Sequence, residues 1–406
     1  MAEFPARRPA SVARRRHGFH RSGPRPAGVH RERSLATLAA VVMMLLVVYA
    51  SLFPFEGWRW PAGSTVVQAL DLPWPRWRDH ADEWLNRLGY VPVGLLVTVA
   101  FLRVGRGLGA SLLLGIAVPS VLSYAMEVTQ HLLPARVPSL RDWLGNATGA
   151  VAGAVLAIVL QLTGWLDRWR IMRDRWFTRD SATALILLML WPAALLVPAP
   201  LPFTLGQCWQ EIRAWMVPLI GSLPLSALGL EFVVAAPKTL PLGAAPITEI
   251  GAIALSVVSP LALACAAGLP GVRRGYVLLG LAGIGLLGMM LSTAMNFGPA
   301  HAWAWFTPAT AVALALAFLM ALLLLLPSGR LCAVLGLLAT ATAVILAAQV
   351  QPDAYHAASL QAWEQGRFIR FSGLAQWVGW LWPYAAMGWL VLHLMRDPDS
   401  LQFGRR

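Results

Sequence analysis

Seven polar or charged residues stand out because they occur at helical spacing beside long apolar stretches. They form three pairs and one single basic residue: Asp82 with Asn86, Glu127 with Gln130, Asp142 with Asn146, and Arg136. Residues three or four positions apart lie on one face of an α-helix, so each pair presents its polar groups to one side. Carboxylates and amides bind hydroxyl or amine groups, and an arginine can bind a phosphate or carboxylate through two parallel hydrogen bonds.

Two interpretations of this set involve a ligand. In an enzyme site, Glu127 and Asp142 are the candidate catalytic groups, because two carboxylates with different proton affinities can act as general acid and base. In a binding site, Arg136 holds a phosphate or carboxylate of a lipid headgroup, and the other side chains complete the hydrogen bonds. The candidate binding residues are Asp82, Asn86, Gln130, Arg136 and Asn146.

Each residue also has a purely structural interpretation. Asp142 could cap a helix N-terminus, and Arg136 could neutralise one of the two carboxylates. Gln130 and Asn146 could form hydrogen bonds between helices, worth about 0.6 kcal/mol each in a membrane. One ion pair does not account for polar groups at three helix ends, so the whole set favours a binding or catalytic site.

The sequence contains no motif for a cofactor or a metal. Walker, dinucleotide-binding, HExxH and GxSxG motifs are absent, so ATP-driven transport and zinc proteolysis are not expected. The cysteines Cys208, Cys265 and Cys332 are far apart in the chain, a pattern that suggests neither a metal or redox pair nor a disulfide framework.

The composition indicates which elements carry these residues. Of the 406 residues, 58% are hydrophobic and 13% are charged, and an average soluble domain has about 25% charged residues. The apolar residues lie in long blocks, which excludes a soluble enzyme, a disordered chain and a coiled coil. We expect an all-α polytopic membrane protein with about ten spans, at 35–53, 88–102, 111–130, 142–162, 182–199, 247–269, 276–295, 303–326, 331–350 and 374–395.

Charge placement predicts the orientation of these spans. With both termini in the cytoplasm, 22 of the 32 basic residues lie on the cytoplasmic side, in agreement with the positive-inside rule. The apolar segment 214–236 is interrupted by Pro218, Pro224 and Glu231, and we expect it to be interfacial or re-entrant. Counting it as a span would invert every later helix.

With this topology the seven polar residues lie at one depth, near the outer membrane surface. The three spans that carry them are consecutive and joined by short loops, so they should be neighbours. The last of these spans also has Gly145, Gly149 and Gly153 at every fourth position, a pattern that lets membrane helices pack closely. The sequence therefore predicts a polar pocket beneath the outer headgroups.

The same residues resemble the VanZ-like family, and the resemblance covers 35–162. The family pattern is Glu-x-x-Gln, then Arg, then Asp-x-x-x-Asn-x-x-Gly-x-x-x-Gly. The family's namesake is linked to tolerance of the glycopeptide antibiotic teicoplanin, so the resemblance implies a role in the bacterial cell envelope. Many members carry an acid at the place of Ser139, so the site here has one negative charge fewer. The match is carried by Glu127, Gln130, Arg136, Asp142, Asn146, Gly149 and Gly153, with Asn86 and Pro92-Val93-Gly94 upstream.

We expect five parts along the chain. The basic, Trp-containing stretch 165–179 is typical of a surface helix that lies on anionic lipid, and the later helices look like the extension of longer VanZ-like proteins, serving mainly as a membrane scaffold. The parts are a disordered basic cytoplasmic tail (1–34), a VanZ-like four-helix membrane domain (35–162), a cytoplasmic amphipathic linker (163–181), a six-helix membrane domain (182–395) and a cytoplasmic tail (396–406).

Three functions are compatible with these observations. The first is binding or handling of an envelope lipid or glycolipid headgroup in the outer polar pocket. The second is an integral membrane enzyme that acts on a glycolipid or lipid-linked precursor by carboxylate chemistry, although no nucleophile is identifiable. The third is a scaffold for a polysaccharide or wall-synthesis machine. The expected location is the inner (plasma) membrane, and the expected partners are a membrane lipid or lipid-linked glycan and envelope-biogenesis proteins, without nucleic acid.

Overall fold

The structure, a computed structural model, describes residues 35–53, 55–63, 65–74, 80–208, 212, 240–241, 245–351 and 369–396. Almost all of the regular structure in these residues is helical. In chain order the elements are α1 (Leu35–Leu52), α2 (Val66–Leu70), α3 (His80–Arg103), α4 (Leu108–Gln130), α5 (Leu140–Leu162), α6 (Trp165–Trp176), η1 (Arg179–Ser181), α7 (Ala182–Ala194), β1 (Leu240–Pro241), α10 (Pro246–Ala267), α11 (Val272–Phe297), η2 (Pro299–His301), α12 (Pro308–Leu323), α13 (Gly329–Ala348), β2 (Val350–Gln351) and α15 (Ile369–Met395). The two short strands pair in parallel.

Each expected span coincides with a helix. Seven helices in the described residues are long and apolar enough to cross a membrane, namely α1, α3, α4, α5, α10, α11 and α13, while α7 and α12 are apolar but shorter. The prediction of a helical, multi-pass membrane protein is therefore confirmed, whereas ten spans and their orientation stay predictions. The segment 214–236, the tail 1–34 and all of the tail 396–406 except Arg396 lie outside the described residues.

Several helix ends differ from the expectation by four residues or more, among them the start of α12 at Pro308 rather than 303 and that of α15 at Ile369 rather than 374. Helix α3 begins at His80 rather than near residue 88, because a polar first turn can extend a membrane helix beyond its apolar stretch. Helix α7 ends at Ala194 rather than 199. Pro198 and Pro200 follow it, and proline lacks the backbone N–H that would continue the helical hydrogen bonds.

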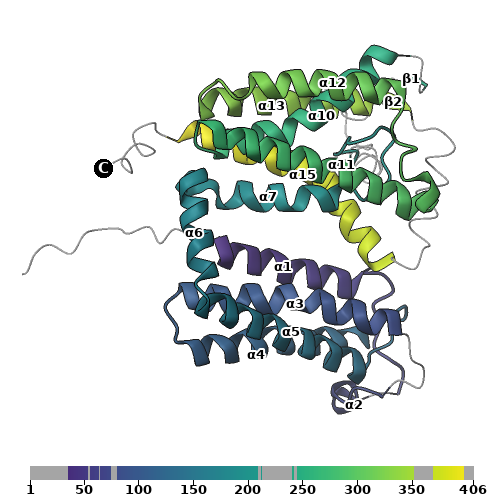
Figure 1. Ribbon diagram of the computed structural model, residues 1–406. Helices are drawn as coiled ribbons and strands as arrows, with labels where there is room; N and C mark the ends of the chain where they lie inside the picture. The colour runs from purple at the N-terminus through teal and green to yellow at the C-terminus, as the bar shows by residue number, and fades with distance from the viewer. Residues whose placement is uncertain are drawn as a thin grey trace, which may run out of the picture. The chain divides into compact units, whose positions relative to one another are not determined.

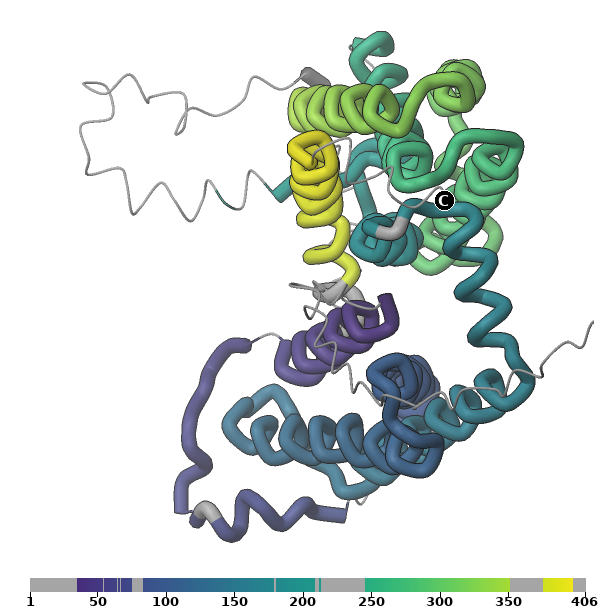
Figure 2. Tube along the Cα trace, turned by 90° about the vertical axis from the view of Figure 1, so that its left-hand side faces the viewer, coloured from purple at the N-terminus to yellow at the C-terminus, as the bar shows by residue number. Residues whose placement is uncertain are grey.

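Helices α1, α3, α4 and α5 form a bundle in which α3 contacts the other three (Figures 1 and 2). The contact between α3 and α5 depends on small residues. A Cβ atom on Gly149 or Gly153 would overlap the backbone carbonyl oxygen of Arg87 or Val91, respectively. A Cβ atom on Gly145 would make only ordinary contacts, with Cγ of Arg87 at 3.8 Å and the carbonyl oxygen of Glu83 at 3.9 Å. Two of the three glycines in the pattern therefore lie where the two backbones touch.

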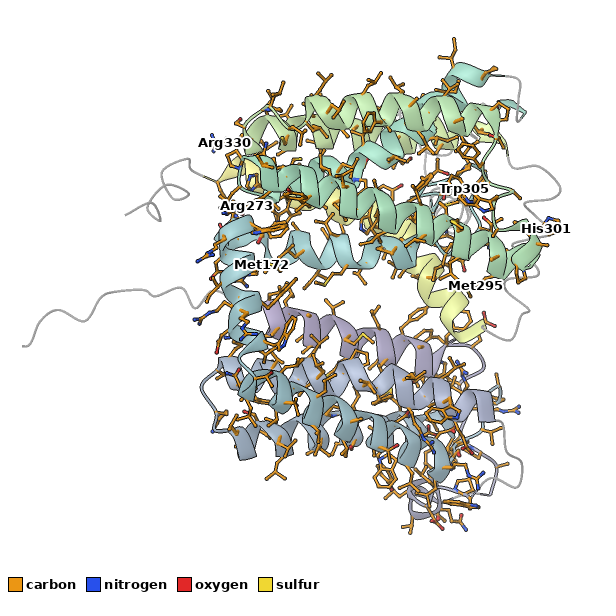
Figure 3. The ribbon with its side chains drawn as sticks, in the orientation of Figure 1. Met172, Arg273, Met295, His301, Trp305 and Arg330 are labelled. Atoms are coloured by element: carbon orange, nitrogen blue, oxygen red, sulfur yellow. The ribbon has the colours of Figure 1, made fainter. Side chains whose placement is uncertain are left out.

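Arginine side chains gather at one end of the helices, around α6. Arg103 at the end of α3 pairs with Asp167 of α6 at 3.5 Å, and Arg273 donates a hydrogen bond to the carbonyl oxygen of Arg175 at 2.6 Å. Figure 3 places Arg273 and Arg330 together at this end of the later helices. All five residues belong to segments that the charge distribution assigns to the cytoplasmic side.

Helix α10 is the central helix of the C-terminal group. Most of its 22 residues are buried, and it contacts α7, α11, α12 and α13. Helix α15 packs on α7 and α13, and the indole N–H of Trp382 donates to the carbonyl oxygen of Leu187 at 2.7 Å. The side chains of Cys265 and Cys332, on α10 and α13, contact each other, a proximity that their separation in the sequence did not predict.

Candidate functional site

The polar residues singled out in the sequence come together at one end of the N-terminal bundle. This end consists of the C-terminal ends of α1 and α4 and the N-terminal ends of α3 and α5 (Figure 1). It is opposite to the end at which Arg103 contacts α6. Hydrogen bonds of the predicted site residues hold three of these ends together, those of α1, α4 and α5.

Glu127 is buried, with 5% of its surface exposed, and it connects α4 to α5. Its Oε2 accepts a hydrogen bond from the backbone N–H of Ser139 at 2.8 Å. Ser139 is the N-cap of α5, and its Oγ accepts from the backbone N–H of Asp142 at 3.2 Å. The interpretation of Asp142 as the helix cap is therefore wrong: Asp142 lies in the first turn of α5, where a carboxylate still interacts favourably with the helix dipole.

Arg136 and Gln130 both bind the end of α1. One guanidinium nitrogen, Nη2 of Arg136, donates to the carbonyl oxygens of Ala50 at 3.0 Å and Phe53 at 2.5 Å. Gln130 donates from Nε2 to the carbonyl oxygen of Ser51 at 2.8 Å. The last carbonyls of a helix have no partner within the helix, so these two side chains fix α1 against α4 while keeping a positive charge at this end of the bundle.

Asn146 and Tyr90 contribute polar atoms that have no hydrogen-bond partner in the part of the chain that the structure describes. Asn146 donates from Nδ2 to Oγ of Ser123 at 2.9 Å, but its buried Oδ1 has no partner. The buried hydroxyl of Tyr90 likewise has none within hydrogen-bonding geometry, although it interacts with Ser123 and with the charge of Glu127. These side chains place an acceptor and a hydroxyl group beside a buried carboxylate.

Tyr90 was missing from the sequence prediction, although a signal for it exists. It follows Asn86 by four residues and therefore continues the polar face of α3 that Asp82 and Asn86 begin. Asn86 is half-buried on this helix. Asp82 lies in the first turn of α3, and its side chain is not among those that the structure describes. Searching the helix face for tyrosine as well as for charged and amide residues would have found it.

A second cluster beside the site was also missed. Glu83 forms ion pairs with Arg141 at 3.1 Å and with Arg87 at 3.9 Å, and Arg141 lies over the ring of Trp74 at 4.8 Å. The spacing of Glu83 and Arg87 by four residues is readable from the sequence. The contact with Arg141, 58 residues away, is not.

The loop after α1 is held against this end of the bundle. The hydroxyl of Tyr124 donates to the carbonyl oxygen of Leu70 in α2 at 2.5 Å, and the backbone N–H of Leu140 donates to the carbonyl oxygen of Pro73 at 3.1 Å. The indole of Trp143 packs edge-on against Tyr124, with ring centroids 6.0 Å apart. Aromatic side chains therefore connect the loop to the C-terminal part of α4 and the N-terminal part of α5.

The arrangement offers hydrogen-bond acceptors, a hydroxyl and a guanidinium. Within the part of the chain that the structure describes, His, Cys, Asp and Glu side chains form no group of three or more that could hold a metal ion. Carboxylate and amide oxygens accept hydrogen bonds from hydroxyl and amine groups. The set is suited to a polar group that donates hydrogen bonds.

Comparison with known proteins gives a family for this part of the chain. A family model described as VanZ/LLP1 matches residues 32–161, a segment that contains α1 to α5 and stops before α6. No curated protein and no solved structure matches the chain. Residues 32–161 thus form an N-terminal VanZ-like domain within a larger, multi-pass helical membrane protein.

Proposed function

We propose that the VanZ-like domain binds the headgroup of a bacterial envelope lipid or lipid-linked glycan at the polar end of α1, α3, α4 and α5. The observation that carries this proposal is that two buried polar atoms, Oδ1 of Asn146 and the hydroxyl of Tyr90, have no partner in hydrogen-bonding geometry among the described residues. A buried polar group without a partner costs about 1–3 kcal/mol. A ligand that supplies the missing hydrogen bonds recovers this energy.

The chemistry of the site indicates which part of a lipid it takes. Asn146 Oδ1 and the carboxylate of Glu127 are acceptors, so the bound group must donate, as sugar hydroxyls and amines do. Arg136 supplies a positive charge suited to a phosphate. The residues lie at helix ends, the level at which lipid headgroups meet a membrane helix. A phosphate-linked sugar or an aminated phospholipid headgroup satisfies all of these groups.

The test is to remove the Tyr90 hydroxyl without changing the ring. We expect Tyr90→Phe to lower the amount of lipid that co-purifies with the protein, measured by mass spectrometry, by about fivefold, which corresponds to one net hydrogen bond of about 1 kcal/mol. Tyr276→Phe, at an exposed position of α11, is the matched control and should retain the lipid. Equal lipid in both variants would rule out the proposed site.

The second candidate function is an enzyme, and the burial of Glu127 beside Tyr90 favours it. Glu127→Gln distinguishes the two functions, because the glutamine Oε1 can still accept the hydrogen bond from the Ser139 N–H and keep α4 tied to α5. A binding protein with this substitution should keep its lipid and complement a deletion strain. An acid–base enzyme should keep its lipid but lose complementation, because an amide cannot exchange a proton in the reaction.

A further inference from the structure

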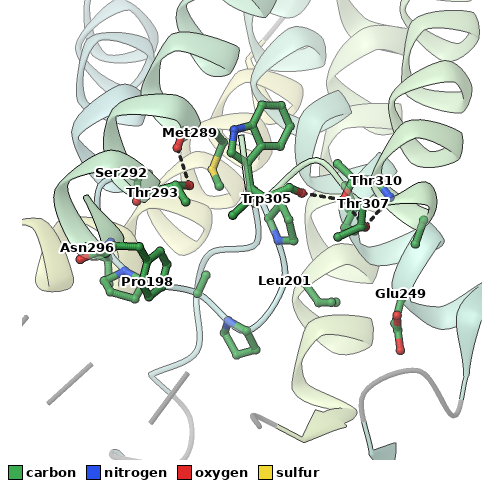
Figure 4. Close-up of a pocket in the computed structure, with 18 of the residues that line it drawn as sticks. Pro198, Leu201, Glu249, Met289, Ser292, Thr293, Asn296, Trp305, Thr307 and Thr310 are labelled. Atoms are coloured by element: carbon green, nitrogen blue, oxygen red, sulfur yellow. Dashed lines mark hydrogen bonds between the residues drawn. The ribbon is translucent and has the colours of Figure 1, made fainter. Parts of the chain in front are cut away.

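A cleft of about 660 Å³ lies among the C-terminal helices (Figure 4). Its walls are the N-terminal end of α10, the C-terminal end of α11, the start of α12 and the proline-rich segment that follows α7. The volume is in the range of sites that bind small molecules. None of its residues belongs to the VanZ-like domain, and the sequence predicts that these helices serve mainly as a membrane scaffold.

The cleft is formed by segments that cannot continue as helices. Pro198 and Pro200 line the cleft in the segment after α7, where they lack the backbone N–H that would continue the helix. On the opposite wall, Thr307 caps α12 by accepting a hydrogen bond from the backbone N–H of Thr310 at 3.2 Å. The ring of Trp305 packs edge-on against Phe203, with centroids 5.6 Å apart. These local contacts hold the cleft open between the helix ends.

Most polar side chains in the cleft already donate their hydrogens to the protein. The hydroxyls of Ser292 and Thr293 donate to backbone carbonyl oxygens at 3.1 Å and 2.9 Å, and Thr310 donates to the carbonyl oxygen of Trp305 at 3.1 Å. Among the buried side chains, Trp305 differs: it is only 6% exposed, and its indole N–H has no partner within the described residues. Figure 4 shows this ring beside Met289 and Thr293 in the cleft.

The charge of the cleft selects against anionic ligands. Among the described residues that line it, none is basic, and Glu249 is the one acid, 8% exposed in the first turn of α10. Hydroxyl groups match this lining, because a hydroxyl can accept from an indole N–H such as that of Trp305 or donate to a carboxylate such as that of Glu249. The remaining surface is mainly apolar, with prolines, Leu201, Ile253 and Phe297, and is suited to a hydrocarbon chain.

We propose that this cleft binds an uncharged lipid with a hydroxyl headgroup, of the diacylglycerol or glycosyl-diacylglycerol class. Figure 3 places Trp305, His301 and Met295 at the end of these helices opposite to Arg273 and Arg330. In the predicted topology this is the exterior side, where the cleft can exchange lipid with the outer leaflet. The proposal is independent of the headgroup site in the VanZ-like domain, since the two share no residue.

The experiment uses the full chain in nanodiscs that contain a photoactivatable diacylglycerol or, separately, a photoactivatable phosphatidylglycerol. We expect the diacylglycerol probe to label peptides of α10–α12 and the anionic probe to label them much less. Trp305→Phe should lower the diacylglycerol labelling by about fivefold, the effect of one lost hydrogen bond. Trp303→Phe, which changes an exposed tryptophan stacked on the same ring, should leave it unchanged.

A second variant guards against a folding defect in Trp305→Phe. Ala304 lines the cleft but is exposed, so Ala304→Trp can block the entrance without disturbing the core, and it should abolish labelling in a protein with unchanged thermal stability. Equal labelling by the two probes, or labelling that survives both Trp305→Phe and Ala304→Trp, would overturn the proposal. The lipid that co-purifies with Tyr90→Phe is a different measurement from the labelling of α10–α12. The two proposals can therefore fail independently of each other.

Discussion

At the scale of the residue, the polar side chains at this end of the VanZ-like domain support the fold, and in the proposed function they also bind a ligand. Arg136 illustrates this double role. It ties the last carbonyls of α1 to the loop between α4 and α5, and the same bonds restrict where its charge can lie. Glu127 does the same for α5 through Ser139. Substitutions here must therefore be judged for stability before they are judged for binding.

Arg136→Ala should destabilise the protein by about 1.5–3 kcal/mol, because a charged donor to two backbone carbonyls is lost. Arg136→Lys should recover part of this, since an ammonium can reach one carbonyl but cannot reproduce the planar fork. Thermal unfolding in detergent, followed by tryptophan fluorescence, measures both. Arg59→Ala, at an exposed loop position, is the control. If Arg136→Ala unfolds at the temperature of the unmodified protein, the contacts with α1 contribute nothing measurable.

The sequence predicted the helix faces of the site but not the partners of each side chain. Spacing by three or four places Glu127 with Gln130 and Asp142 with Asn146, because helix geometry is local. The Arg136 contact with Ala50 spans 86 residues, and its acceptor is a backbone carbonyl that every residue possesses. No residue type marks such an acceptor, so only the packed bundle reveals it.

At the scale of the element, the contact between α3 and α5 gives the site its rigidity. Gly149→Ala or Gly153→Ala should destabilise the bundle by about 1–3 kcal/mol, because the added methyl group would overlap a backbone carbonyl that cannot move away as a side chain can. Gly145→Ala, where the nearest atoms are 3.8 Å or more away, should have little effect. Thermal unfolding of the three variants checks this order, and equal stability would show that α3 and α5 are not in close contact.

The exposed tryptophans and arginines of helix α6 lead to a separate prediction about the membrane surface. It runs across the direction of α5 in Figure 1 and exposes Trp165, Trp169, Arg168 and Arg170. A basic helix with exposed tryptophans suits the surface of an anionic membrane, at about 1 kcal/mol per basic residue. Arg168→Glu combined with Arg170→Glu should therefore reduce enrichment of phosphatidylglycerol around the protein in mixed nanodiscs. The reverse enrichment, or no change relative to Arg59→Glu, would contradict a membrane-surface role.

At the scale of the whole molecule, hydropathy was sufficient to find the helices, because the bilayer demands long apolar stretches whose backbone hydrogen bonds are made internally. It was not sufficient to find the cleft in the C-terminal half. That cleft is lined by prolines, aliphatic residues and a tryptophan, with Glu249 as its acid, and these residue types are common in any membrane helix. The Trp305 indole N–H in this cleft has no partner within the described part of the chain, a property of packing rather than of residue type.

Both proposed sites require the same side of the membrane, so the topology is the prediction on which the molecule as a whole depends. Cys208, Cys265 and Cys332 are all buried, so introduced cysteines can be labelled selectively in intact cells with a membrane-impermeant maleimide. We expect Trp58→Cys and His301→Cys, at exposed positions before α2 and in η2, to react from outside. Met172→Cys in α6 should react only after permeabilisation. If the cysteines at positions 58 and 301 react from opposite sides of the membrane, an odd number of spans separates them and one of the two proposed sites faces the cytoplasm. If only the cysteine at position 172 reacts in intact cells, the orientation is inverted and both proposals lose their outer-leaflet ligands.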